Sequence, residues 1–302
     1  MKRVVSVSIG SDTRNKRVES YILGEKFRIE RIGTNGDINK AIEWIKNLDG
    51  KVDAFGMGGI DLFLTCGTRK RYVLKEAVPI MKAARISPIV DGTGVKNTLE
   101  GRIVNYLKNN KLVEFEGKKV LVTSAMDRYK MTEAFVQGGC DVLIGDLIFA
   151  LGIPVPIRRL ETLRKLAGLT MPLISRMPFK MLYPTGEKQL QANPDRFGKF
   201  YEECDIIAGD YHYIKKYMPE NLKNKTIVTN TITEDDVAVL KSKGASLLVT
   251  TTPQWEGRSF GTNVIEAILV SLARKKPEEL SESDYYRMLD ELDFKPRIEQ
   301  LN

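Results

Sequence analysis

The segment 117–146 constrains the fold of this chain more than any other. Two short apolar runs rich in β-branched residues, 120–122 and 142–144, flank a stretch whose apolar residues recur at helical spacing. Gly138 and Gly139 end that stretch, as glycines often do at the end of a helix. Two buried strands joined by a helix form a βαβ unit, so the sequence predicts an α/β fold with a doubly wound parallel sheet.

The same unit carries residues that could hold a nucleotide cofactor. Asp146 ends the second strand about twenty residues past the first turn, where a carboxylate can accept hydrogen bonds from the ribose of NAD. The turn itself lacks the G-x-G-x-x-G glycines that let a backbone approach pyrophosphate. Asp146 therefore has two interpretations, a ribose ligand or a carboxylate that caps the following turn. If NAD or NADP binds, the residues expected beside its phosphates are Ser124, Ala125, Met126 and Arg128.

The composition is that of a globular protein large enough for two domains. The chain has 302 residues, of which 42% are hydrophobic, and a net charge of +8. Its basic residues are scattered, which favours a solvated basic surface over nucleic-acid binding. An anionic substrate or a phosphate-bearing cofactor fits the same charge. Three cysteines without a C-x-x-C pair and a single histidine argue against a disulfide framework and a metal site. Without a signal peptide or a membrane-length apolar run, we expect a cytoplasmic protein.

Strands and helices alternate on both sides of the central unit. Strands are predicted at 4–9, 26–32, 52–57, 87–90, 206–208, 226–228 and 247–250. Helices are predicted at 72–84, 96–108, 147–169, 234–243, 257–273 and 283–292. This pattern divides the chain into an N-terminal α/β domain of substrate-binding type (1–115), a Rossmann-like nucleotide-binding domain (116–256) and C-terminal helices (257–302).

Polar side chains collect where a strand enters a helix, in the turn 91–101. Lys96 is a candidate catalytic residue there, because an ammonium group can donate a proton or stabilise negative charge. The alternative is an ordinary capped helix start, with Thr93 or Asn97 as the cap. The residues expected to bind substrate are Gly58, Gly59, Asp91, Asn97 and Thr98.

Further polar residues follow the later strands, at the sheet edge where ligands of such folds bind. His212 is the only imidazole in the chain and is the second catalytic candidate, although a lone histidine is more often structural. The other strand-end residues expected near the cofactor are Asp210, Asn230 and Thr251. A separate segment, 171–189, holds three prolines, three methionines and two aromatic residues. It is interpreted as a lid or pocket wall, with Tyr183, Thr185, Glu187 and Lys188 as its polar groups, or as a homodimer contact.

The blocks KRVVSVSIGS, FGMGGIDL, VDGTGVKNTLE, LYPTGEK and TTTPQWEGRSFGTNVIEA resemble those of a bacterial family labelled quinate 5-dehydrogenase. The resemblance implies a protein like shikimate and quinate dehydrogenases, whose C-terminal helices pack back on the substrate domain. It implies an NAD(P)-dependent oxidoreductase that acts on a small polar hydroxy or carbonyl compound. Shikimate dehydrogenases pair the aspartate of an N-T-D run with a catalytic lysine on an earlier loop. Here Leu99 follows Asn97 and Thr98 at the aspartate position.

A fainter resemblance is to cyanobacterial fatty acyl-carrier-protein reductases, which share a glycine-pair segment and a C-terminal helix pair. Their nucleophilic cysteine would fall near Asn263, where this chain has no thiol. The absent glycines and the absent aspartate keep a second function open. In that reading the chain is a non-catalytic protein that binds a nucleotide or small molecule on a degenerate Rossmann scaffold.

Overall fold

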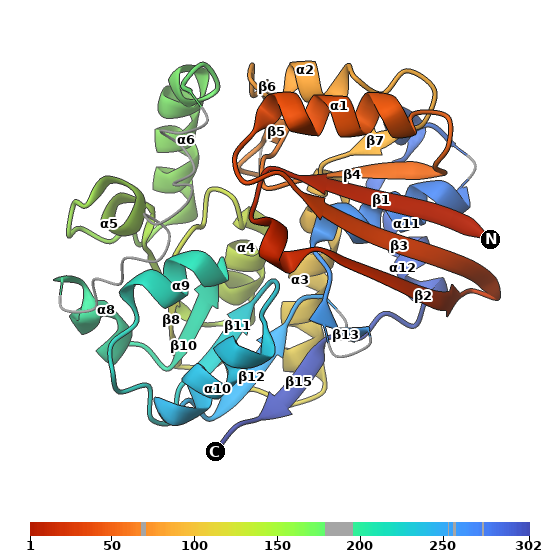
Figure 1. Ribbon diagram of the computed structural model, residues 1–302. Helices are drawn as coiled ribbons and strands as arrows, with labels where there is room; N and C mark the ends of the chain where they lie inside the picture. Colours follow the sequence, from red (N-terminus) through yellow and green to blue (C-terminus); the bar gives the residue numbers. More distant parts are fainter. Residues whose placement is uncertain (68–70, 179–195, 253, 256–257, 274) are drawn as a thin grey trace.

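The structure is a computed structural model that describes residues 1–67, 71–178, 196–252, 254–255, 258–273 and 275–302. It is an α/β protein built on two mainly parallel sheets with helices packed on their faces (Figure 1). This confirms the predicted fold class. No helix in the described ranges has both the length and the apolar character needed to cross a membrane.

The first sheet has the strand order β2-β3-β1-β4-β7, and only β2 is antiparallel to its neighbour. Its strands are β1 (Lys2–Ser8), β2 (Lys16–Ile22), β3 (Glu25–Gly33), β4 (Ala54–Gly58) and β7 (Ile89–Val90). Helices α1 (Ile38–Leu48) and α2 (Val78–Met81) cover one face, and α3 (Thr93–Asn109) and α11 (Thr262–Ala273) cover the other. Side chains alternate between these faces, since Val4 packs with α3 and α11 and Val5 with α1 and α2.

The second sheet has the order β15-β12-β11-β10-β8-β9, and only β15 runs antiparallel to its neighbour. Its strands are β8 (Lys119–Val122), β9 (Asp141–Ile144), β10 (Ile206–Gly209), β11 (Thr226–Thr229), β12 (Leu247–Thr250) and β15 (Arg297–Gln300). Counted from β8, the five parallel strands follow the order 2-1-3-4-5 of flavodoxin-like sheets, so the chain reverses direction across the sheet between β8 and β10. Ligands of open α/β sheets bind at such a reversal.

The remaining elements lie around these two sheets. The helices of the second half are α4 (Tyr129–Gly138), α5 (Asp146–Leu151), α6 (Leu160–Ile174), α8 (Gly198–Glu202), α9 (Tyr211–Tyr217), α10 (Glu234–Ser242) and α12 (Glu282–Glu291). Short elements are η1 (Asp12–Arg14), β5 (Phe63–Leu64), β6 (Tyr72–Val73), β13 (Gln254–Trp255), β14 (Arg258–Ser259) and η4 (Pro277–Glu279).

Three predicted helices are wrong in extent. The predicted helix 257–273 includes the short strand β14, and α11 begins only at Thr262. The segment 72–84 begins as the short strand β6, and its only helix is the four-residue α2, which has Pro79 in its first turn. The segment 147–169 contains two helices instead of one, because Gly152 takes a left-handed conformation (φ 72°) and ends α5. The part of the predicted lid or dimer segment from 179 to 189 lies outside the described residues.

The C-terminal helix α11 packs back on the first sheet, as the resemblance implied. The Asn263 side chain donates a hydrogen bond to the Ser6 hydroxyl (2.7 Å), and the Lys2 ammonium donates to the Ser271 carbonyl (2.6 Å). The last strand, β15, instead joins the second sheet, so the segment after 257 contacts both halves of the protein. The domain limits given above stay a prediction.

The close approach of α11 to β4 depends on Gly56. A Cβ atom at this position would lie 2.8 Å from the Asn263 backbone oxygen. We predict that Gly56→Ala lowers the free energy of unfolding by about 1–3 kcal/mol, because the helix must shift outward. Urea denaturation should show this loss. Gly168→Ala is the control, since a Cβ there meets open space, and equal stabilities for the two variants would contradict the prediction.

Candidate functional site

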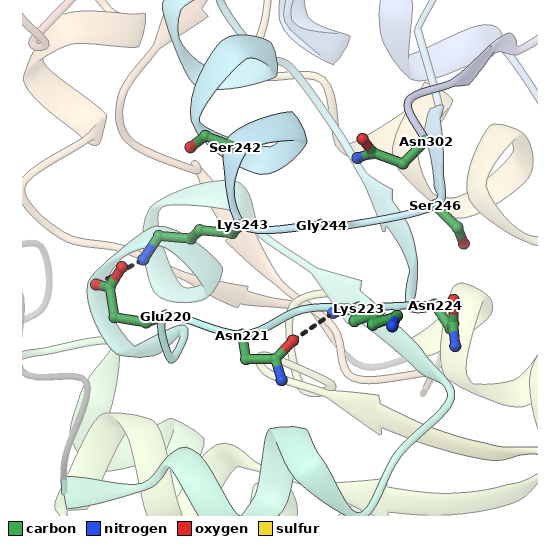
Figure 2. A pocket seen from close by; sticks show the side chains of 9 residues that line it. All are labelled: Glu220, Asn221, Lys223, Asn224, Ser242, Lys243, Gly244, Ser246 and Asn302. Atoms are coloured by element: carbon green, nitrogen blue, oxygen red, sulfur yellow. Dashed lines mark hydrogen bonds and ion pairs between the residues drawn. The ribbon is translucent and has the colours of Figure 1, made fainter.

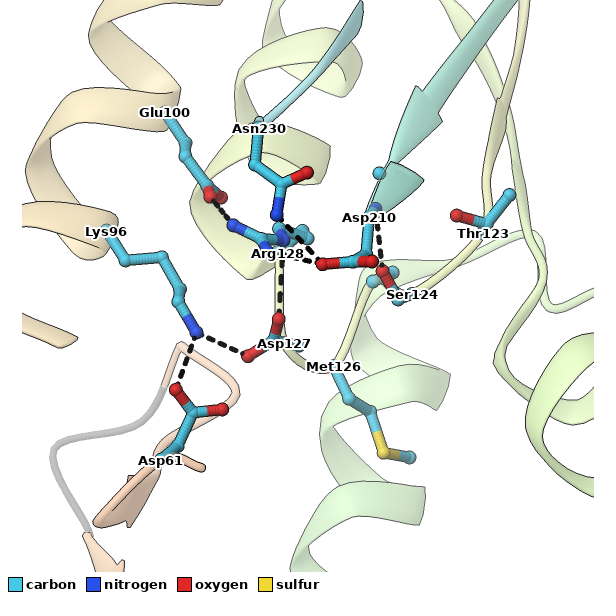
Figure 3. A network of polar contacts seen from close by, with 12 residues as sticks. Asp61, Lys96, Glu100, Thr123, Ser124, Met126, Asp127, Arg128, Asp210 and Asn230 are labelled. Atoms are coloured by element: carbon cyan, nitrogen blue, oxygen red, sulfur yellow. Dashed lines mark hydrogen bonds and ion pairs between the residues drawn. The ribbon is translucent and has the colours of Figure 1, made fainter. Parts of the chain in front are cut away.

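Charged and polar side chains from five separate segments meet at the carboxyl ends of β8, β10 and β11 (Figure 3). We call this group the Lys96 cluster; its members are Asp61, Lys96, Glu100, Asp127, Arg128, Asp210 and Asn230. It lies at the point where the second sheet reverses its winding. One member, Asp61, comes from the loop after β4, a strand of the first sheet.

Lys96 lies in the first turns of α3 and bridges the two halves of the protein. Its ammonium group is 3.1 Å from Asp61 Oδ1 and 2.7 Å from Asp127 Oδ1, and 10% of the side chain is exposed. Burial alone would lower the pKa of Lys96, but the carboxylates of Asp127 and Asp61 raise it above its ordinary value. The group therefore stays positively charged at neutral pH, which suits a hydrogen-bond donor better than a general base.

The two carboxylates that hold Lys96 differ in their surroundings. Burial raises the pKa of Asp61, although the nearby Lys96 ammonium favours the charged form. Burial would also raise the pKa of Asp127, but Lys96 and Arg128 lower it below its ordinary value. Asp127 is the more open of the two, with 36% of its side chain exposed against 16% for Asp61. Asp61 is therefore the better candidate for proton transfer near neutral pH.

Arg128 forms the buried half of the cluster. Its guanidinium group pairs with Glu100, with Asp210 at 3.1 Å and with Asp127 at 3.3 Å, while the Asn230 side chain donates to Asp210 at 2.9 Å. Burial would lower the pKa of Arg128, but these carboxylates raise it. With 5% of its side chain exposed, Arg128 holds the turn after β8 against α3 and β10.

Asp146 turns toward the protein instead of outward. Its two carboxylate oxygens accept hydrogen bonds from the backbone amides of Ala125 (2.8 Å) and Met126 (2.9 Å). The carboxylate thus binds the turn after β8, and not the turn after its own strand. Burial raises the pKa of Asp146 to about 6, despite the two amides that favour the charged form.

The predicted substrate residues serve different roles in the structure. The Asp91 carboxylate accepts from the backbone amides of Leu62 (2.6 Å), Phe63 (3.2 Å) and Thr93 (2.9 Å), so it fixes the loop after β4 to the start of α3. The Thr98 hydroxyl is buried and donates to carbonyls of its own helix. Asn97 lies half-buried on α3; Gly58 ends β4, and Gly59 follows it in a left-handed conformation (φ 76°).

The remaining predicted residues lie near the cluster. The Ser124 hydroxyl accepts from the Asp210 amide (3.3 Å), and the His212 amide donates to Asp210 (2.9 Å). The His212 side chain is exposed, and its charge helps to lower the pKa of Asp210 against the effect of burial. Thr251 is fully buried, and its hydroxyl has no hydrogen-bond partner among the described residues.

Sequence reasoning missed the two aspartates that hold Lys96. Asp61 follows the end of β4 at Gly58 by three residues, and Asp127 lies inside the turn after β8. Carboxylates at strand ends of a parallel sheet are the signal that could have found both. Within the described residues, no three histidine, cysteine or carboxylate side chains are arranged to hold a metal ion.

A pocket of about 480 Å³ lies at the opposite edge of the second sheet (Figure 2). It is lined by Glu220, Asn221, Lys223, Asn224, Ser242, Lys243, Gly244, Ser246 and Asn302. Most of these residues lie between α10 and β12 or just before β11, and Asn302 follows the antiparallel strand β15, so the pocket lies at the amino ends of the parallel strands. The pocket is therefore separate from the Lys96 cluster and contains none of the predicted site residues.

Two family models match the chain. The model described as domain of unknown function DUF8754 matches residues 94–301, which is well over half of the chain. The chain belongs to this family. A second model, described as domain of unknown function DUF8753, matches residues 3–91, and no curated protein matches significantly. The junction of the two matches falls at the start of α3, two residues before Lys96.

Among solved structures, the similar ones include L-tryptophan dehydrogenase from Nostoc punctiforme, with 10% identity, 96% of this chain and 80% of that chain covered, and a TM-score of 0.39. Hetero-hexameric glutamate dehydrogenase from Thermus thermophilus is 12% identical, with 97% of this chain and 74% of that chain covered, and has a TM-score of 0.44. A galactofuranose binding protein is 12% identical, with 97% of this chain and 99% of that chain covered, and has a TM-score of 0.35. All three scores are low, so we draw no function from them.

The buried ion pair of Arg128 and Glu100 predicts a large effect on stability. Arg128→Met leaves the Glu100 carboxylate, which is 1% exposed, without its partner, so we expect a loss of about 3–5 kcal/mol in unfolding free energy. Adding Glu100→Gln should recover part of that loss in urea denaturation. Lys165→Met is the control, because its pair with Glu161 is exposed and should change stability by less than about 1 kcal/mol. A double variant less stable than Arg128→Met would disprove the explanation.

Asp146 predicts a pH dependence of stability. Its folded pKa of about 6 lies above the ordinary value of 3.8, so the folded state binds this proton more tightly than the unfolded chain. The resulting stabilisation is complete below the ordinary pKa and is lost as the pH rises through about 6. Asp146→Asn should therefore remove a decrease in unfolding free energy between pH 4 and 6. Asp141→Asn, at an exposed position, should follow the wild type, and parallel curves for all three proteins would refute the shift.

Proposed function

We propose that the Lys96 cluster binds a small polar compound through a hydroxyl or carbonyl oxygen. The observation that carries this proposal is the position of the Lys96 ammonium group. It is charged, belongs to a side chain that is 10% exposed, and lies at the strand ends where the second sheet reverses. An ammonium group has three N–H donors, and Lys96 uses two of them on Asp61 and Asp127. The third can donate to an oxygen of a ligand.

The neighbouring aspartates suit the same class of compound. Asp127 is partly exposed beside the ammonium group, and a carboxylate can accept a hydrogen bond from a ligand hydroxyl. A donor and an acceptor side by side recognise a hydroxyl group by both its oxygen and its hydrogen. An apolar ligand would leave the third N–H group of Lys96 and the exposed lone pairs of Asp127 without a hydrogen-bond partner, which costs free energy.

The turn after β8 does not fit a dinucleotide pyrophosphate in the way the sequence suggested. The amides of Ala125 and Met126 would have to donate to phosphate, but both donate to Asp146. Arg128 could pair with phosphate, but it is shared among Glu100, Asp127 and Asp210. This arrangement favours a small-molecule-binding protein on a degenerate Rossmann scaffold, and we take that as the leading function.

The second candidate is an NAD(P)-dependent oxidoreductase of the shikimate dehydrogenase kind, acting on a small polar hydroxy or carbonyl compound. The pairing of Lys96 with Asp61 favours it. The resemblance implies a lysine on an early loop and an aspartate on the following helix; here the aspartate is on the loop and the lysine on the helix. Lys96 would stabilise negative charge on the substrate oxygen, and Asp61 would exchange its proton. A nicotinamide would supply the hydride when bound.

Thermal-shift titration can separate these two functions. We expect at least one of quinate, shikimate, lactate, pyruvate and inositol to raise the melting temperature of the wild type, and none of NAD, NADH, NADP and NADPH to do so. At a hundred times its dissociation constant, a ligand adds up to about 2.7 kcal/mol of stability. Lys96→Met should weaken binding at least tenfold, because it removes the charged donor.

Asn97→Ala is the matched control on the same helix, because no described contact links its side chain to the cluster. It should bind the same compound with unchanged affinity. A shift with one nicotinamide pair, together with turnover lost in Lys96→Met, would replace the leading function by the oxidoreductase. No shift with any of the small compounds would remove the proposal for this site.

A further inference from the structure

A second group of cations lies at the carboxyl ends of the first sheet. Arg31 on β3 is half-buried, and its guanidinium donates to the Ser11 carbonyl (2.9 Å) and the Ser8 hydroxyl (3.0 Å). In the part of the chain that the structure describes, no carboxylate pairs with it. The other arginines of this strand and its neighbour do have such partners, since Arg28 pairs with Glu19 and Arg3 with Glu30.

Burial and a neighbouring cation both disfavour the charged form of Arg31. Burial, together with the smaller effect of the nearby Arg14, lowers the pKa of Arg31 to about 10. Arg14 lies in η1 and likewise has no carboxylate partner among the described residues. An anion that lies between or beside two guanidinium groups in a partly buried place would offset their mutual repulsion.

The backbone beside Arg31 lies close to its guanidinium group at a glycine, so no side chain crowds the cation on that side. Gly10 follows β1, and a Cβ there would lie only 3.1 Å from Arg31 Nη2. The Ser8 hydroxyl accepts from both the Gly10 amide (3.1 Å) and Arg31, so its own hydrogen is free to be donated. Guanidinium N–H groups and a hydroxyl hydrogen are the donors that oxyanions prefer.

These donors are linked to the Lys96 cluster by a short piece of chain. Ser8 and Gly58 are paired residues at the ends of β1 and β4. A Cβ on Gly59 would lie 3.0 Å from the Gly10 amide nitrogen, so the loops after β1 and β4 touch. Asp61, which holds Lys96, is two residues beyond Gly59. The loop that carries Asp61 therefore lies against the loop after β1, whose Ser8 hydroxyl contacts Arg31.

We propose that Arg31 and Arg14, with the Ser8 hydroxyl, form an oxyanion subsite for a carboxylate or phosphate group of the ligand. The second half of the inference rests on the proposed function, because it places the hydroxyl or carbonyl oxygen of the same ligand at Lys96. The ligand class is then a small anionic hydroxy or carbonyl compound. The guanidinium pair supplies the affinity for the anion, and the cluster recognises the oxygen.

Calorimetric titration at constant ionic strength, with inorganic phosphate and with acetate, tests the subsite directly. We expect the wild type to bind one of them, and Arg31→Gln to weaken that binding at least tenfold. Tighter binding of phosphate would identify a phosphorylated ligand, and tighter binding of acetate a carboxylic acid. Arg28→Gln, on the same strand but paired with Glu19, should bind like the wild type.

Arg14→Gln is a second variant that tests the subsite if Arg31→Gln fails to fold. We expect it to fold, because no described hydrogen bond involves the Arg14 side chain. It should also weaken binding of the anion. Lys96→Met should bind inorganic phosphate and acetate unchanged, so a failure of the proposed function does not hide the subsite. Anion binding that is absent from the wild type, or the same in Arg31→Gln and Arg14→Gln as in the wild type, would overturn the inference.

Discussion

The buried pairing of Arg128 with Glu100 is the interaction on which the arrangement of the site depends. Glu100 belongs to the helix that covers the first sheet, and Arg128 to the turn at the end of the first strand of the second sheet. Because neither charge can be left alone in the interior, the two segments are held in one relative position. Arg128 also forms ion pairs with Asp127 and Asp210, and Asp127 in turn forms an ion pair with Lys96. The cluster is thus built outward from one ion pair.

Much of the fold could be predicted because its strands are buried on both faces. Runs such as 120–122 and 206–208 are apolar and β-branched, and the structure places β8 and β10 on them. The strand β2 (Lys16–Ile22) was missed because it lies at an edge, where polar residues such as Arg17 and Glu19 face solvent. The extents of α5 and α6 were missed because a single glycine conformation separates them.

The site was harder to predict, because its residues come from distant parts of the chain. The interpretation of Lys96 as a polar group at a sheet edge needs only the local turn, but its pairing with Asp61 is a tertiary contact across 35 residues. The Asp146 carboxylate illustrates the limit of motif reasoning. Its spacing from the turn is that of a ribose ligand, yet its two hydrogen bonds go to the backbone of the turn itself. Spacing in sequence does not define the direction in which a side chain points.

The contact between α11 and the first sheet has a consequence for how the chain is synthesised. The hydrogen bond from Asn263 to Ser6 joins residues 257 positions apart, and α11 covers the face of the sheet that carries Val4, Phe27 and Ile29. A ribosome releases the strands of this sheet long before it releases α11. The part of that apolar face that α11 covers therefore stays exposed while the chain is growing, and a chaperone can bind the nascent first sheet there.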